Sequence, residues 1–157
     1  MSDNAPAKVL VVDDMEDDLY MTRRFLGAPR GMKCEFIEAT DGKAGLDAIA
    51  AAGAIDLVLL DINMPVMNGF EMLQQMRDNP DMRDIPVVMY TGSTYDKDKE
   101  RATALGAQGY LEKPAQFAAL SAFISTLPTV RLVREEGGVP TLVRAFDAPD
   151  EKKSGRE

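Results

Sequence analysis

The chain has 157 residues, of which 45% are hydrophobic, and a formal net charge of −8 at pH 7. This length favours one domain with a single sizeable core, and the acidic balance disfavours direct nucleic-acid binding, which usually requires a basic surface. The sequence contains no histidine, which excludes Ser-His-Asp and Cys-His catalysis, most zinc sites and a histidine phosphodonor.

The cellular compartment is predicted from the cysteine count and from the apolar segments. Cys34 is the single cysteine, so it cannot form an internal disulfide, which fits a reducing compartment. The first residues, MSDNAPAK, lack the apolar segment of a signal peptide, and no apolar stretch reaches the roughly 18 residues of a membrane span. We therefore expect a cytoplasmic protein without a membrane partner, and we expect residues 1–7 to be disordered.

Five short runs predict strands. In chain order they are VLVV (9–12), KCEFIEA (33–39), LVLL (57–60), IPVVMYT (85–91) and GYLE (109–112). The first and third runs are apolar throughout, which is typical of strands buried on both faces of a parallel sheet.

Helical patterns lie between these runs. Apolar or small residues spaced by three or four positions share a helical face: Leu19, Thr22 and Leu26; Leu46 and Ile49; Phe70 and Leu73; Phe117, Leu120, Ile124 and Leu127. Gly27, Gly53, Asn79-Pro80 and Gly106 are placed where helices should end. Five strands alternating with five helices predict a doubly wound α/β domain over about residues 8–127.

Polar residues follow the predicted strands. Asp13-Asp14 follow the first, Asp61 follows the third, Thr91 ends the fourth and Lys113-Pro114 follow the fifth. In an open parallel sheet, ligands bind beyond the carboxyl ends of the strands, so these side chains are expected to share one pocket. Each has an ordinary alternative explanation, such as a helix cap for the aspartate pair or a turn for Thr91-Gly92.

The combination of these residues indicates phosphoryl transfer. Two carboxylates about 4 Å apart repel each other by roughly 4 kcal/mol at an effective dielectric constant near 20, so three of them require protonation or a cation. Lys113 and a hard divalent ion can supply that positive charge, and an all-oxygen site suits Mg²⁺, with Mn²⁺ as an alternative. Asp61 would then be a nucleophile that forms an aspartyl phosphate.

Four motifs resemble the response-regulator receiver domain of two-component signalling: VLVVDD (9–14), LLDINMPVMNG (59–69), MYTGS (89–93) and GYLEKP (109–114). The resemblance implies a flavodoxin-like sheet with strand order 2-1-3-4-5. It also implies a single-domain regulator that accepts a phosphoryl group from a sensor histidine kinase or histidine phosphotransfer protein and signals to a downstream protein. Such a chain assists its own phosphorylation and dephosphorylation but is not a conventional enzyme.

The resemblance assigns a role to each site residue. Asp61 would be the phosphoacceptor; Asp14, Asp61 and the backbone carbonyl of Asn63 would ligate Mg²⁺, and Asp13 would support the metal largely through water. Thr91 would hydrogen-bond the phosphoryl group, and Lys113, in a cis bond to Pro114, would contact its oxygens. Tyr110 would move inward as Thr91 moves.

Three alternatives come from other classes. A magnesium-dependent phosphohydrolase of the haloacid-dehalogenase type would need a second aspartate two residues after Asp61, where this chain has Asn63. A nucleotide or flavin binder would need a phosphate loop where this chain has the acidic DDMEDD (13–18). A receiver-like interaction module, or a receiver fragment of a larger regulator, remains open.

The C-terminal region is a separate question. Residues 128–146 contain two strand-like arms around EEGG, which predicts either a β-hairpin or a disordered extension, with Pro140 restricted to an edge or to a strand start. Residues 147–157 are expected to be a disordered tail. A lone hairpin would expose apolar side chains, so it is expected to pack on its own receiver or on a second subunit. Stand-alone receivers paired with bacterial phytochrome kinases carry C-terminal extensions that support dimers, so by resemblance a homodimer is one role open to this region.

Overall fold

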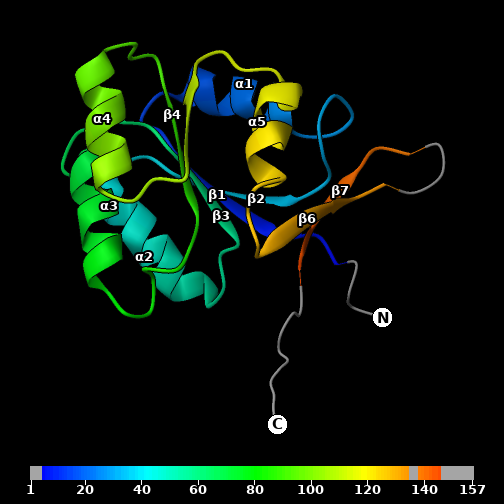
Figure 1. Ribbon diagram of the computed structural model, residues 1–157, viewed down its shortest axis with the longest axis horizontal. Coiled ribbons are helices and arrows are strands. Elements are labelled where there is room, and N and C mark those ends of the chain that lie inside the picture. Colours follow the sequence, from blue (N-terminus) through cyan, green and yellow to red (C-terminus); the bar gives the residue numbers. More distant parts are fainter. Residues whose placement is uncertain (1–4, 135–137, 146–157) are drawn as a thin grey trace, which may run out of the picture.

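Strands and helices alternate along the computed structural model, which describes residues 5–134 and 138–145 (Figure 1). The strands of the main sheet are β1 (Lys8–Val12), β2 (Glu35–Ala39), β3 (Leu57–Leu60), β4 (Val87–Thr91) and β5 (Gly109–Glu112). The helices are α1 (Glu16–Leu26), α2 (Gly42–Ala52), α3 (Gly69–Asp78), α4 (Asp96–Ala104) and α5 (Phe117–Ile124), and β6 (Val130–Val133) and β7 (Thr141–Arg144) follow them.

The main sheet has the order β2-β1-β3-β4-β5, and all of its strand pairs are parallel. The predicted doubly wound α/β fold and its strand order are therefore confirmed. Strand β1 lies between β2, at one edge of the sheet, and β3, the central strand. The strand order reverses at this point, and parallel sheets of this kind bind ligands beyond the carboxyl ends of such strands.

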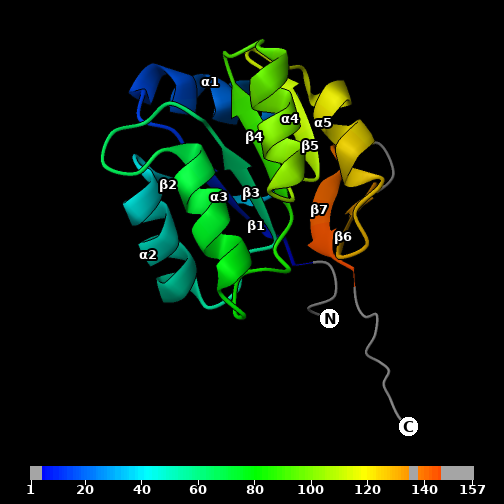
Figure 2. The same cartoon turned by 60° about the vertical axis from the view of Figure 1, so that its left-hand side comes forward.

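Helices cover both faces of the sheet (Figure 2). One buried cluster joins α1 and α5 to the sheet, through side chains such as Leu19 and Leu120. The other joins α2, α3 and α4 to the opposite face, through side chains such as Ile49 and Met72. Neighbouring strand residues alternate between the clusters, with Val11 in the first and Val12 in the second, because successive strand side chains point to opposite faces.

The helix boundaries follow from local chemistry. Asn68 and Glu71 form a capping box at the start of α3, in which each side chain accepts a hydrogen bond from the other residue's backbone amide. Asp41 caps α2 by accepting a hydrogen bond from the amide of Ala44. Helix α5 begins at Phe117, so Ala115 and Gln116 belong to the connection after β5.

Strands β6 and β7 form an antiparallel ribbon beside the main sheet (Figures 1 and 2). The ribbon packs on the domain, because Val130, Leu142 and Val143 are buried. Lys33 joins it to the segment before β2: its amide donates to the carbonyl of Pro140 (2.8 Å), and its carbonyl accepts from the amide of Leu142 (2.9 Å).

The prediction that residues 1–7 are disordered is wrong for Ala7, the last of them. Ala7 is buried, its amide donates to the carbonyl of Leu142 (2.7 Å), and its carbonyl accepts from the amide of Glu35 (2.8 Å). Chain pairing therefore orders a segment whose composition alone predicted disorder. The expected tail, residues 147–157, lies outside the described residues, as do most of the EEGG turn and Phe146.

Within the described ranges, no helix has both the length and the apolar character that a membrane-spanning segment requires.

Candidate functional site

Three carboxylates meet at the carboxyl ends of β1 and β3. Asp13 and Asp14 follow β1, Asp61 follows β3, and one oxygen from each lies within 4.8 Å of the others. The backbone holds the strand ends in register: the amide of Asp13 donates to Ala39 on β2, and the amide of Asp61 donates to Val12 on β1. Asp13 and Asp61 are 1% and 7% exposed, so the parallel sheet brings two largely dehydrated carboxylates together.

The loop after Asp61 needs a glycine at its end. The amide of Gly69 donates to the carbonyl of Ile62 (2.8 Å), which brings the start of α3 against the end of β3. A Cβ atom on residue 69 would lie 2.1 Å from the carbonyl oxygen of Asp61, so any larger residue would displace the strand end. The amide of Ile62 also donates to Asp61 Oδ1 (2.8 Å), which leaves Oδ2 for other contacts.

Lys113 supplies the positive charge of the site. It follows β5, its amide donates to the carbonyl of Thr91 (2.9 Å), and its bond to Pro114 is cis, as the resemblance implies. Its Nζ atom donates to Asp61 Oδ2 (3.2 Å), to Asp18 Oδ2 (2.9 Å) and to Asp13 Oδ2. One ammonium group therefore connects carboxylates from the ends of β1 and β3 and from the first turn of α1.

The pKa shifts reflect burial and charge. Burial raises the pKa of the Asp13 carboxyl above its ordinary value, although hydrogen bonds from Lys113 and from the Met15 amide oppose that shift. Burial by itself would lower the pKa of Lys113, but the hydrogen bonds to Asp13 and Asp18 and the charge of Asp61 raise it overall. Lys113 therefore stays protonated at neutral pH.

The donor set fits a hard divalent cation. Asp13, Asp14 and Asp61 offer only carboxylate oxygens, the ligands that Mg²⁺ prefers, and burial makes their unbalanced charge costly. Lys113 contacts Asp13, Asp18 and Asp61, and Asp14 lies beside two of these, so one ammonium leaves negative charge to be neutralised. Mg²⁺ usually takes only one or two carboxylates and keeps several waters, so a site with few protein ligands suits it.

Thr91 and Tyr110 are connected through Ser93. Thr91 is buried at the end of β4, and its Oγ1 accepts from the amide of Ser93 (3.4 Å). The hydroxyl of Tyr110, on β5, donates to the carbonyl of Ser93 (3.0 Å), and the hydroxyl of Ser93 donates to Asp98 Oδ2 on α4 (2.6 Å). The loop after Thr91 is thus linked both to β5 and to α4.

A cleft of about 450 Å³ opens over Asp61. Its lining residues come from α1 and from the ends of β3, β4 and β5: Asp18, Met21, Asp61, Asn63, Tyr90, Thr91, Gly92, Ser93, Lys113 and Pro114. A Cβ atom at Gly92 would meet no heavy atom within 4 Å, so the space beside Thr91 is open. A carboxylate, a hydroxyl and an ammonium around an open space of this size can bind and receive a phosphoryl group.

The structure brings the predicted acidic residues, Thr91 and Lys113 to one edge of the sheet. Tyr110 is linked to this site because its hydroxyl donates a hydrogen bond to Ser93, which lines the cleft. Asn63 lies exposed at the cleft. Asp18 is the residue that the sequence analysis missed. The signal was the acidic run DDMEDD, because side chains in the first turn of a helix lean back toward the segment before it.

Comparisons with known proteins agree with this geometry. Residues 9–125 match the family described as the response regulator receiver domain. The chain is 31% identical over 109 residues to the polar-differentiation response regulator DivK of Brucella anthropi, which covers 69% of this chain and 85% of that protein. The chain is also 36% identical to a probable cyclic di-GMP phosphodiesterase of Vibrio cholerae over 126 residues. This alignment covers 80% of this chain but only 27% of that protein.

Solved structures show the same architecture. The chemotaxis protein CheY4 of Vibrio cholerae is 32% identical with a TM-score of 0.68, and the alignment covers 78% of this chain and 99% of that one. The bacteriophytochrome response regulator AtBRR is 31% identical with a TM-score of 0.69, covering 78% of this chain and 92% of that one.

Proposed function

Because the chain belongs to the response regulator receiver domain family, we propose that it accepts a phosphoryl group on Asp61 and passes the signal on through protein contacts. Two-component phosphoryl signalling is the role of this family, and the family is a signalling module rather than a conventional enzyme. The observation that carries the assignment is the contact between Lys113 Nζ and Asp61 Oδ2 (3.2 Å), inside a cluster of carboxylates at the switch point of the sheet.

The proposed step is a displacement at phosphorus. A carboxylate oxygen of Asp61 forms the new O–P bond, and the P–N bond of a donor phosphohistidine breaks, with the electron pair leaving on the imidazole. The hydroxyl of Thr91 and the ammonium of Lys113 line the cleft around the acceptor and can neutralise charge on the phosphoryl oxygens. This is the sense in which the chain assists its own phosphorylation, and with water as the nucleophile, its dephosphorylation.

Mg²⁺ is proposed as the cofactor, with Mn²⁺ as a substitute. The carboxylates of Asp14 and Asp61 and the carbonyl of Asn63 would hold it, with Asp13 in support. When bound, the ion supplies positive charge to the transferring phosphoryl group. The residues of this chain position the acceptor, and Lys113 balances part of the charge of Asp61.

The proposed partners follow from the family. A sensor histidine kinase or a histidine phosphotransfer protein would donate the phosphoryl group in the cytoplasm, and a downstream protein would recognise the altered surface; neither nucleic acid nor membrane is a proposed target. We propose that residues 8–127 form the receiver and residues 128–146 an extension. Since the chain spans about a quarter of its Vibrio cholerae relative, a receiver within a larger regulator is the second candidate.

Labelling with acetyl phosphate tests the acceptor. In the presence of Mg²⁺, intact-mass measurement of the wild type should show one added phosphoryl group that is lost in base, and Asp61→Asn should show none. Asp14→Ala should raise the Mg²⁺ concentration needed for half-maximal labelling, because a proposed ligand is removed.

Asp56→Asn is the matched control for this experiment. Asp56 is as deeply buried as Asp61 (8% against 7% exposed), but its carboxylate contacts Lys8 and Arg144 and not the cleft residues. This variant should still be labelled, with folding checked by circular dichroism. Equal labelling of Asp61→Asn and the wild type would reject Asp61 as the acceptor.

A further inference from the structure

Lys113 has as many carboxylate partners as it has N–H donors. The ammonium group carries three hydrogens, and Asp13, Asp18 and Asp61 each accept one hydrogen bond from it. No donor is left over, so Lys113 can contact a phosphoryl group on Asp61 only by giving up one of these contacts. The identity of the released carboxylate determines how the site responds to phosphorylation.

The three partners differ in their access to water. The side chains of Asp13 and Asp61 are 2% and 9% exposed, whereas that of Asp18 is 41% exposed. A carboxylate released into the buried part of the site would not regain hydration, so its release is costly unless the proposed Mg²⁺ takes over its charge. Asp18 can be rehydrated on release, because its side chain is already partly exposed. The loss of its ion pair also costs little, because exposed ion pairs contribute little net free energy.

We propose that Asp18 is a positioning residue that holds the Lys113 ammonium in the unmodified protein and gives it up when a phosphoryl group forms on Asp61. This inference rests on the proposed function, because it requires Asp61 to carry that group. Asp18 lies 95 positions before Lys113 in the sequence, so the contact joins the first turn of α1 to the end of β5. Phosphorylation would therefore release a side chain on α1 as well as reorganise the loop after β4.

Competition between Asp18 and the phosphoryl group for the Lys113 ammonium should change the affinity of the site for the phosphoryl group. Asp18 and the phosphoryl group exclude each other from the same N–H donor, so each weakens the binding of the other by an equal factor. Removing the charge of Asp18 should therefore favour the phosphorylated form. Since a partly exposed ion pair contributes up to about 1 kcal/mol, the expected gain in apparent affinity is about two- to fivefold.

Beryllofluoride, an analogue of the phosphoryl group, is the probe. The 157-residue chain is titrated with fluoride at fixed Be²⁺ and Mg²⁺, and the amide resonances of Thr91 and Lys113 report the bound fraction. Asp18→Asn should reach half-saturation at a two- to fivefold lower beryllofluoride concentration than the wild type. Asp18→Glu keeps the charge and should remain near the wild-type value.

Asp17→Asn is the matched control. Asp17 is exposed in the same first turn of α1, so this variant removes an equal charge from the same end of the helix while leaving the Lys113 contact in place. An unchanged or weaker affinity in Asp18→Asn, or an equal gain in Asp17→Asn, would overturn the competition. Failure of wild-type labelling at Asp61 would instead overturn the proposed function, so the two outcomes are distinguishable.

Discussion

Tyr110 is tied to the loop after β4 by one hydrogen bond, from its hydroxyl to the carbonyl of Ser93 (3.0 Å). The ring is half-buried and packs against the cluster under α2, α3 and α4, and Lys99 Nζ lies 5.8 Å from the ring centroid. Burial raises the pKa of this phenol above its ordinary value, so it stays protonated and can donate at neutral pH. We infer that movement of Thr91 toward a phosphoryl group pulls Ser93 away and frees Tyr110.

This switch predicts a change at one tyrosine. On addition of beryllofluoride, the ring resonances of Tyr110 should shift, because the hydrogen bond to Ser93 is lost and the ring reorients. Tyr20, exposed on α1, is the control and should shift least. Tyrosine-selective ¹³C labelling, assigned with Tyr110→Phe, makes the measurement. A Tyr110 signal that stays fixed while Thr91 shifts would contradict the coupling.

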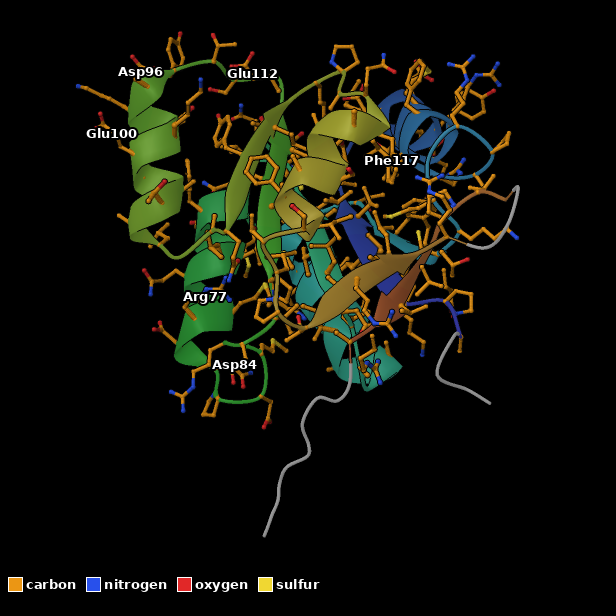
Figure 3. All side chains as sticks on the ribbon, turned by 45° about the vertical axis from the view of Figure 1, so that its right-hand side comes forward. Arg77, Asp84, Asp96, Glu100, Glu112 and Phe117 are labelled. Carbon is orange, nitrogen blue, oxygen red and sulfur yellow. The ribbon has the colours of Figure 1, made fainter. Side chains whose placement is uncertain are left out.

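At the scale of the elements, Arg77 connects the end of α3 to two neighbouring segments (Figure 3). Its guanidinium donates to the carbonyls of Arg83 (2.9 Å), Ile85 (3.0 Å) and Gly106 (2.8 Å). Gly106 has a φ of +92°, and a Cβ atom there would lie 2.9 Å from Arg77 Nε, so a larger residue would be strained and would crowd the guanidinium. The fixed fork of an arginine suits several carbonyls at once.

Replacing Arg77 should therefore destabilise the fold. We expect Arg77→Met to lower the free energy of unfolding by about 2 kcal/mol, because hydrogen bonds from a charged group are lost. Arg77→Lys should recover only part of this, since one ammonium cannot reach all three carbonyls. Urea unfolding measures the difference, and Arg24→Met, an exposed arginine on α1, is the control. Equal stability of Arg77→Met and Arg24→Met would show that these contacts contribute nothing.

At the scale of the whole molecule, the β6–β7 ribbon covers one end of the domain. Arg144 Nε donates to Asp56 Oδ1 (2.7 Å), and Asp56 Oδ2 accepts from the amide of Lys8 at the start of β1 (2.9 Å). Cys34 packs against the cluster that includes Leu142, and burial raises the pKa of its thiol to about 12. The ribbon thus forms part of the core around β1 and the start of β2.

Truncation after Leu127 tests this role. The free energy of unfolding should fall by at least about 3 kcal/mol, because the burial of Val130, Leu142 and Val143 is lost. Labelling of Asp61 should persist, since among the described residues those that line the cleft end at Pro114. The pKa of Cys34 should fall toward its ordinary value, so alkylation at pH 8 should be faster because more thiolate is present.

Two further measurements complete the truncation experiment. Arg144→Ala, in the untruncated 157-residue chain, removes the contact to Asp56 and should cause a smaller loss of stability in the same direction. Light scattering on both lengths tests whether the extension also joins two copies, in which case the truncated chain should be the smaller species. Unchanged stability and unchanged alkylation of Cys34 would show that the ribbon is not part of the core.

The local sequence was sufficient to predict the strands, most helix ends and the polar groups beyond the strands. Continuous apolar runs such as LVLL (57–60) are compatible only with a strand or helix buried on all sides, and an acid directly after such a run marks a strand end. Once strands are parallel, their carboxyl ends share one edge. Asp13, Asp61 and Lys113 could therefore be placed together from their positions alone, and the resemblance supplied the strand order.

Only the tertiary structure determined which distant groups touch. The pairing of Lys113 with Asp18, of Ala7 and Lys33 with β7, and of Arg77 with three carbonyls each depends on how separate elements pack. Val66 has a φ of +68°, although a β-branched residue seldom adopts that conformation. The physical reason is that propensity and periodicity act over a few residues. These contacts join segments that are far apart in the chain, and they are set by the geometry of the packed sheet and helices.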